Sequence, residues 1–154
     1  MNIDLSNIEK KIEQIKNSFS GRSPEEKIQL LLDMGRSLTS YPNDLKIPSY
    51  QVSGCQSILY LSSRFENGII IFNAHADALV SAGLAALLIS VYSGEPPETI
   101  LNTSPHFLLD LGILSSITPS RSNGLAHIHQ RIKKDALKFL LSTMNSIELN
   151  PATP

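Results

Sequence analysis

The chain has 154 residues, 42% of them apolar, which is enough for one hydrophobic core and too little for two ordinary domains, so a single domain over residues 1–154 is expected. Lys and Arg number 13 against 14 Asp and Glu, which excludes the basic excess that draws a protein onto nucleic acid. The longest apolar stretch, residues 76–92, is too short for a membrane span, and no signal-peptide pattern opens the chain, so a cytoplasmic location without membrane contact is expected.

Two amphipathic helices are predicted at the start of the chain. Apolar residues recur at steps of three and four from Ile8 to Phe19, which predicts a first helix that ends near residue 20. Ser23, Pro24 and Glu26 then combine an N-cap serine, a proline at the first helical position and a capping-box glutamate. A second helix is therefore expected to begin at Pro24.

A β-hairpin is predicted in the middle of the chain. Residues 42–54 contain two prolines and read as a connecting segment that includes one short extended piece. β-branched and aromatic residues predict a strand over residues 56–63. Asn67 and Gly68 tolerate positive φ and indicate a hairpin turn, so residues 69–73 should return as the partner strand.

The rest of the chain is predicted to be mostly helical. Asp77 is expected to cap a buried apolar helix within residues 76–92. Short helices should follow over residues 97–101 and 105–111, and then a loop over residues 118–124. A long final helix should begin at residue 125 and end before a disordered tail at 150–154. The order of helices, hairpin and helices predicts a two-layer α+β fold with a small antiparallel sheet of about three strands.

Cys55 is the single cysteine of the sequence. One thiol excludes an intramolecular disulfide and any zinc or cluster site built from several thiolates of this chain, so no metal or other cofactor is expected. Gly54 before it and a strand after it indicate the tip of a loop, where a thiolate can act as a nucleophile. From spacing alone the commoner interpretation is an inert core residue, since free cysteine is among the most buried residue types.

Four other polar residues are candidate partners of the thiol or of a ligand. His75 ends the second predicted strand and could come near Cys55 as a base, although a polar strand end is the commoner interpretation. His127 and His129 lie about 200° apart around a helix and cannot face one metal site. Arg121, in the predicted loop, offers a planar fork for an anion or a partner's carboxylate, or ties the loop to a neighbouring group.

The segment Val52-Ser53-Gly54-Cys55-Gln56-Ser57, followed by a hydrophobic strand, resembles the signature of the SufE family of cysteine-desulfuration proteins. Three more segments match in the same order, namely His75-Ala76-Asp77-Ala78 with Gly83-Leu84, then Leu111-Gly112-Ile113, and Thr118-Pro119-Ser120-Arg121-Ser122-Asn123-Gly124. The resemblance spans residues 24–140 and implies a fold related to the IscU and NifU cluster scaffolds.

The resemblance also implies a function. Family members are accessory proteins rather than enzymes: they stimulate a pyridoxal-phosphate cysteine desulfurase of the SufS type, accept its sulfur as a persulfide and pass it to the SufBCD scaffold for iron–sulfur cluster assembly. They need no cofactor of their own. Here Cys55 is the implied acceptor, and the residues implied to bind the partner or brace the loop are Gly54, Gln56, His75, Asp77 and Arg121.

Two details of the resemblance concern the surroundings of the thiol. The family often has Asp-Ser-Asp where this chain has His75-Ala76-Asp77, which puts in doubt any contact that needs the first carboxylate. The family cysteine tends to lie in an apolar cavity and to swing out for the partner. Ile58, Leu79 and Leu84 are the expected wall of that cavity.

Three alternatives remain at this point. The same persulfide relay could feed another acceptor, such as tRNA thiolation in the manner of the CsdE branch. A Cys-dependent hydrolase would need a base beside Cys55. A cluster scaffold would need about three thiolate ligands, which a chain with one cysteine lacks.

Overall fold

The computed structural model describes residues 6–55 and 57–149. Gln56 and the expected tail at 150–154 lie outside these residues. The elements in chain order are α1 (Asn7–Phe19), α2 (Pro24–Arg36), the 3-10 turns η1 (Asn43–Leu45) and η2 (Pro48–Tyr50), β1 (Leu59–Glu66), β2 (Ile69–Ala76), α3 (Leu79–Tyr92), α4 (Pro97–Asn102), α5 (Phe107–Asp110), η3 (Leu114–Ser116) and α6 (Pro119–Leu149). Among the described helices, none combines the length and the apolar content that a membrane crossing requires.

The sheet is a single antiparallel hairpin. The turn at Asn67 and Gly68, with φ of 53° and 80°, confirms the predicted hairpin. Within the described residues the sheet has two strands, so the expectation of about three was wrong. The segment expected to supply an extended piece forms η1 and η2 instead, and only Gln51 bridges to Tyr60 of β1. Its prolines explain this, because proline fixes φ and cannot donate to a ladder.

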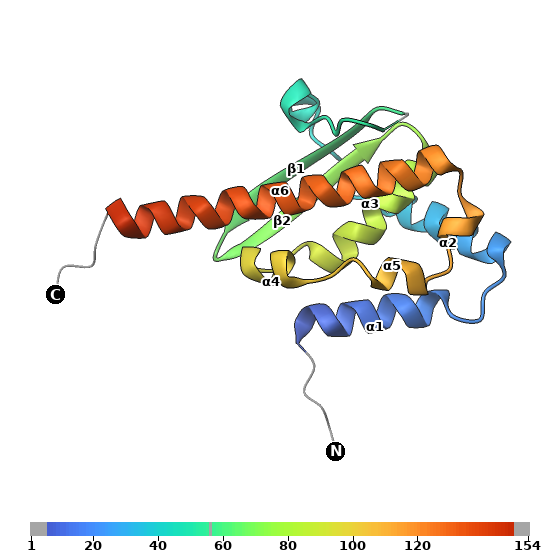
Figure 1. Cartoon of the computed structure of the whole chain (residues 1–154). Coiled ribbons are helices and arrows are strands. Elements are labelled where there is room, and N and C mark those ends of the chain that lie inside the picture. The colour runs from blue at the N-terminus through green and yellow to red at the C-terminus, as the bar shows by residue number, and fades with distance from the viewer. Residues whose placement is uncertain (1–5, 56, 150–154) are drawn as a thin grey trace, which may run out of the picture.

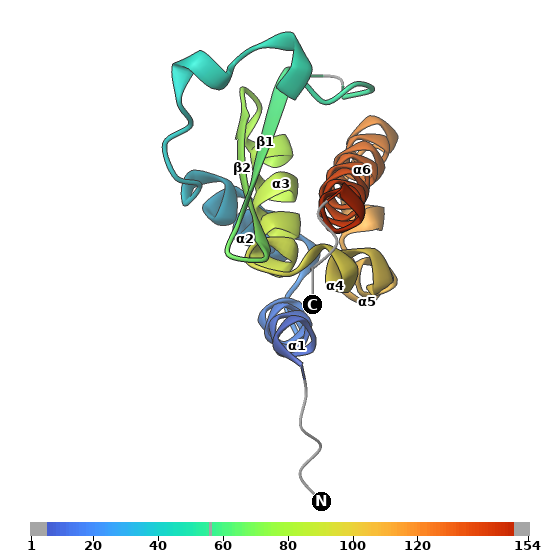
Figure 2. The same ribbon diagram turned by 90° about the vertical axis from the view of Figure 1, so that its left-hand side faces the viewer.

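The hairpin packs on helices, which confirms the α+β class. β2 contacts α3 and β1 contacts α6, and α2 lies along α3 (Figures 1 and 2). On β2 the buried residues alternate, at Ile70, Phe72 and Ala74, as a half-buried strand requires. α3 is buried on nearly all sides, because residues 81–88 are all below the surface. The core therefore lies around α3, between the hairpin and the remaining helices.

A glycine pair sets the distance between α2 and α3. A Cβ added to Gly83 would lie 2.2 Å from the carbonyl oxygen of Leu31, and a Cβ added to Gly35 would lie 2.8 Å from the backbone nitrogen of Gly83. Real Cβ atoms do not approach backbone this closely, so the two helices meet backbone to backbone. Because α3 also carries part of the cysteine's surroundings, this contact positions the site described below.

Two helix starts differ from the prediction. α6 begins at Pro119, so the expected loop over residues 118–124 was wrong: the backbone N–H of Arg121 donates to the Thr118 hydroxyl, 3.3 Å away, as at an N-cap. Ser, Asn and Gly in this stretch suggested a loop, but Thr followed by Pro is also a helix-start signal. The expected Asp77 cap of α3 was wrong, because Ala78 occupies the N-cap position and offers no side-chain acceptor.

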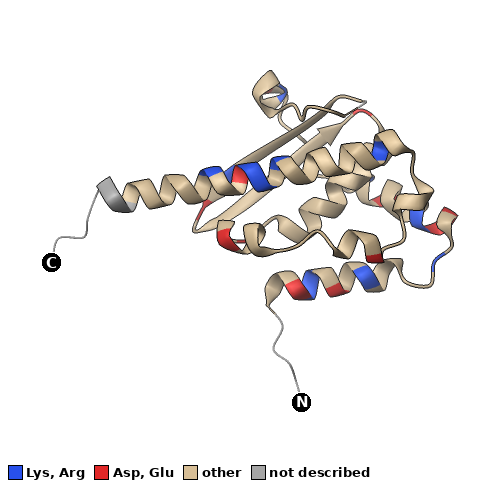
Figure 3. Ribbon diagram, in the orientation of Figure 1, with Lys and Arg blue, Asp and Glu red and all other residues tan. Residues whose placement is uncertain are grey.

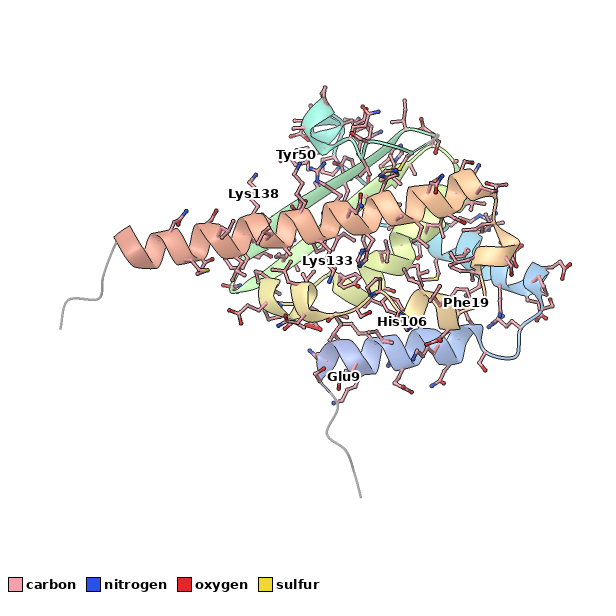
Figure 4. All side chains as sticks on the ribbon, viewed as in Figure 1. Glu9, Phe19, Tyr50, His106, Lys133 and Lys138 are labelled. Atoms are coloured by element: carbon pink, nitrogen blue, oxygen red, sulfur yellow. The ribbon has the colours of Figure 1, made fainter. Side chains whose placement is uncertain are left out.

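A half-buried polar cluster joins α6 to α3 and α4. Lys133 reaches from α6 towards the end of α4 (Figure 4) and donates to the carbonyls of Ile100 and, at 2.6 Å, Thr103. The Tyr92 hydroxyl lies 3.2 Å from Nε2 of His129. Burial, with the Lys133 ammonium close by, lowers the pKa of His129 from its ordinary 6.5 to about 4. His129 is therefore neutral in the folded protein at physiological pH.

The depressed pKa of His129 predicts a loss of stability in acid. Between pH 6.5 and pH 4 the unfolded chain protonates this histidine and the folded chain does not, so the free energy of unfolding falls as the pH drops through that window. Allowing for partial solvent exposure, we expect a loss of roughly 1–2 kcal/mol. Urea unfolding at several pH values measures it. His129→Gln should remove this part of the pH dependence, and an unchanged slope in that variant would contradict the assignment.

Candidate functional site

Cys55 lies in a narrow loop that enters β1. The loop is closed by the Gln51–Tyr60 bridge and by the backbone N–H of Val52, which donates to the carbonyl of Leu59 at 2.9 Å. The chain turns at Gly54, whose φ of +86° lies in the left-handed region that favours glycine. Cys55 is half-buried and is a free thiol. The predicted loop position is therefore confirmed.

The thiol borders a small cavity between its own loop, α3 and the start of α6. The lining residues are Cys55, Leu59, Ser81, Leu84, Ser120, Arg121, Gly124 and Ile128. The cavity volume is about 10 Å³, which is space for one atom of about the size of water. A Cβ added to Gly124 would lie 3.9 Å from Sγ of Cys55, so the first turns of α6 pack directly on the sulfur.

Of the three residues expected to form the cavity wall, only Leu84 does so. Ile58 and Leu79 are each 46% exposed and do not line the cavity. Leu59 and Ile128 take their place, because β1 begins at Leu59 and its buried positions alternate from there. The prediction of an apolar wall was right and two of its three members were wrong.

The burial of Cys55 has a chemical consequence. Desolvation raises the pKa of the thiol, so at neutral pH the resting side chain is a protonated thiol. The thiolate is the nucleophilic form of cysteine. In this arrangement the Cys55 thiol is therefore a weaker nucleophile than a fully exposed cysteine.

Arg121 is the predicted site residue that the structure brings to the thiol. It lies in the first turn of α6, whose Thr118 cap fixes where the helix starts, and it lines the cavity with Cys55. Its neighbour in the cavity wall, Ser120, stands one residue earlier on the same turn. Arg121 therefore adds a permanently charged side chain to an otherwise mostly apolar cavity wall.

His75 and Asp77 pair with each other at the end of β2 and do not line the Cys55 cavity. Nε2 of His75 lies 3.3 Å from Oδ1 of Asp77, and the His75 ring packs near Tyr41 at 6.3 Å between centroids. His75 borders a different cavity, of about 360 Å³, between α2, β2 and α3. Gln56, the remaining predicted residue, lies outside the described residues. The roles of these three residues stay predictions.

Besides the lining residues named above, sequence reasoning missed Ser81, His127 and Gly124 around the thiol. The hydroxyl of Ser81, a residue only 8% exposed, lies 3.2 Å from that of Ser57, and Ser81 lines the cavity. A Cβ on Gly54 would lie 2.4 Å from Nε2 of His127, so this ring covers the turn before Cys55. Gly124 packs against the sulfur. Ser81 could have been found, because it is a polar residue in the first turn of an otherwise apolar helix. The positions of His127 and Gly124 beside the Cys55 loop depend on how α6 packs, and no local pattern indicates them.

The described residues do not gather three or more His, Cys, Asp or Glu side chains in a group that could hold a metal ion. Among the described residues that line the Cys55 cavity, none is His, Asp or Glu, and the His127 ring lies over Gly54 rather than in the cavity wall. The arrangement holds one half-buried thiol beside a small, mostly apolar cavity.

Comparison with known proteins gives consistent results. The model of the SufE family, described as the Fe-S metabolism associated domain, matches residues 13–136. The chain is 34% identical over 139 residues to the cysteine desulfuration protein SufE of Plasmodium falciparum, covering 86% of this chain and 56% of that protein. This chain thus spans about half the length of that relative.

A second relative and a solved structure extend the comparison. The sulfur acceptor protein CsdE of Escherichia coli is 28% identical over 123 residues, which cover 78% of this chain and 84% of that protein. The solution structure of a hypothetical protein from Thermus thermophilus superposes with a TM-score of 0.72 at 26% identity, over 85% of this chain and 96% of that one.

Proposed function

Since this chain belongs to the SufE family, we propose that it accepts persulfide sulfur on Cys55 from a pyridoxal-phosphate cysteine desulfurase and carries it for iron–sulfur cluster assembly. The observation that carries the proposal is the half-buried Cys55 beside a cavity of about 10 Å³. A space of this size is about what one water molecule needs, so a single further atom can lie beside the sulfur. Such a site suits storage of a single additional sulfur.

The transfer is a thiol-exchange reaction. The Cys55 thiolate attacks the outer sulfur of the donor's persulfide, a new sulfur–sulfur bond forms, and the bond to the donor's cysteine breaks, so that cysteine leaves as a thiolate. The proton of the Cys55 thiol goes to solvent or to a base of the donor. No oxidant is needed, because the outer sulfur keeps its oxidation state. The chain is then an accessory protein that raises the turnover of the donor by removing its sulfur.

The single cysteine supports this chemistry. A second thiol within reach would attack the Cys55 sulfur of the persulfide. The two cysteines would then form a disulfide, and the outer sulfur would leave as sulfide. The sequence has one cysteine, so the loaded chain has no such internal competitor. The same fact disfavours a cluster scaffold, which needs about three thiolates. The absence of a carboxylate or imidazole from the described cavity wall disfavours a hydrolase, which needs a base at the thiol.

The next acceptor in this proposal is a scaffold of the SufBCD type. The alternative is that the same relay supplies sulfur to a different process, such as tRNA thiolation. The similarity to CsdE of Escherichia coli, a protein named as a sulfur acceptor, fits this alternative. Transfer from the loaded chain to each acceptor distinguishes the two. The cytoplasmic location also stays a prediction, and cell fractionation with an antibody to the chain measures it.

The proposal is tested with radiolabelled cysteine sulfur. The chain is mixed with a SufS-type desulfurase and labelled cysteine without reductant, and then separated from the donor. Label bound to the chain and released by dithiothreitol is the expected result. An active desulfurase that leaves the chain unlabelled would contradict the proposal.

Arg121→Ala should slow sulfur transfer by about tenfold while Cys55 remains present. The Arg121 side chain forms part of the cavity wall, so its removal opens the space beside the sulfur to solvent. Arg64→Ala is the matched control, because Arg64 is exposed on β1 and pairs with Glu66 away from the cavity. Single-turnover labelling measures both rates. Equal rates in Arg121→Ala and the wild type would show that Arg121 has no part in transfer.

A further inference from the structure

A groove separate from the Cys55 cavity adjoins the cysteine loop on the side of α6. It has a volume of about 210 Å³ and is lined by Gln51, Val52, Ser53, His127, Gln130, Arg131 and Lys134. Its loop residues come immediately before Gly54 and Cys55. His127 belongs to both features, because its ring covers Gly54 and also lines this groove. Any molecule seated in the groove therefore touches the segment that carries the thiol.

The groove is basic. Arg131 and Lys134 line it and none of its described lining residues is Asp or Glu. The nearest carboxylate on α6, Asp135, is 7% exposed and is already bound by the Ser63 hydroxyl at 2.8 Å and by Nε of Arg131 at 3.0 Å. Lys134 is exposed and, within the described part of the chain, forms no ion pair. The positive charge of the groove is therefore not fully neutralised by the protein itself.

The guanidinium of Arg131 is held in place with donors to spare. Nε is fixed by Asp135, and Nη2 donates to the carbonyl of Ser49 at 2.8 Å. A guanidinium has five N–H donors in a planar fork. Among the described residues, Nη1 has no hydrogen-bond partner. Arg131 thus offers a preorganised site of the geometry that carboxylates fit.

The basic character continues along α6. Five of the chain's 13 Lys and Arg residues lie in this helix. Arg131, Lys134 and Lys138 follow His127 at steps of four, three and four, so they share one face. Figure 3 shows the blue segments along α6, and in Figure 4 the Lys138 side chain projects from the helix. The chain as a whole has a net charge of −1, so this concentration of positive charge is local.

We propose that this groove receives carboxylates from an acidic segment of the sulfur donor when the donor docks over Cys55. This inference rests on the proposed function, because a protein that presents its persulfide to Cys55 must lie on the loop that forms one wall of the groove. Complementary charge increases the association rate of two proteins and fixes their orientation. Nucleic acid is the poorer occupant, since the described lining residues include no Phe, Tyr or Trp side chain for base stacking.

The test compares two charge reversals. Lys134→Glu places a carboxylate in the groove, whereas Lys10→Glu makes the same change in net charge on an exposed position of α1, away from the loop (Figure 1). Binding to a SufS-type cysteine desulfurase is measured by calorimetry at low and at high salt. At low salt, Lys134→Glu should weaken the Kd by about tenfold and the difference should shrink at high salt, with Lys10→Glu close to the wild type.

The outcomes separate this inference from the proposed function. If the wild type takes up sulfur but both variants bind the desulfurase equally well, the groove is not the docking site. If Lys134→Glu instead abolishes binding of bulk tRNA and leaves the desulfurase Kd unchanged, the occupant is nucleic acid and the inference is wrong. A wild-type chain that binds no desulfurase and takes up no sulfur overturns the proposed function as well. Lys134 is exposed, and circular dichroism checks that both variants are folded.

Discussion

Cys55→Ser should reduce sulfur uptake from the desulfurase to background. The hydroxyl that replaces the thiol is close in size but does not ionise at neutral pH and forms no persulfide. Since Cys55 is the single cysteine of the chain, no other thiol can substitute for it. The labelling assay with cysteine and a SufS-type desulfurase measures the loss, and turnover of the desulfurase should no longer rise when the variant is added.

The fold of this variant should be unaffected. Cys55 is half-buried and forms no disulfide, so replacing its sulfur by oxygen removes little buried surface. Thermal unfolding followed by circular dichroism serves as the control and should give a Tm close to that of the wild type. Labelling of the variant at the wild-type level would contradict the role of Cys55. A variant that is unlabelled because it is unfolded would be recognised by its Tm.

Gly83→Ala should lower the free energy of unfolding by about 3 kcal/mol, the largest stability effect that we expect of a single methyl group in this chain. Its Cβ would lie 2.2 Å from the carbonyl oxygen of Leu31, and backbone cannot move aside as a flexible side chain does. α2 and α3 would have to separate, which loosens the core around Leu84. Urea unfolding measures the change.

Gly124→Ala is the matched control for Gly83→Ala. Both glycines lie inside helices, but a Cβ on Gly124 would have Sγ of Cys55 as its nearest neighbour at 3.9 Å, an ordinary contact. Alanine is the better helix former by about 1 kcal/mol, so this variant should be as stable as the wild type or slightly more so. Equal stability of the two variants would contradict the close crossing of α2 and α3.

The parts of the fold predicted well were those with local signals. The capping box at Ser23 and Glu26 placed the start of α2 at Pro24, and Asn67-Gly68 placed the hairpin turn. The start of α6 was misplaced because Ser, Asn and Gly suit a loop as well as a capped first turn, and here Thr118 caps a helix that begins at Pro119. The connecting segment before Cys55 does not form the expected third strand because Pro48, in η2, fixes its backbone φ and cannot donate to a strand ladder.

The site was predicted in part. Sequence alone left Cys55 ambiguous between a nucleophile and an inert thiol, and the resemblance to the SufE family favoured the nucleophile. In the structure Arg121 lines the same cavity as Cys55, whereas His75 and Asp77 pair with each other and do not line it. His127 and Gly124 were missed because their approach to the Cys55 loop depends on how α6 packs against a segment far away in the chain, to which no local pattern corresponds.

The most direct test of the carrier role is the intact mass of the chain after incubation with a SufS-type desulfurase and cysteine, without reductant. We predict a gain of about 32 daltons per sulfur that disappears on reduction. Peptide mapping should place the added sulfur on Cys55, and the Cys55→Ser variant should keep its original mass. An unchanged mass of the wild type, beside a desulfurase shown to be active, would contradict the proposal that this chain carries sulfur.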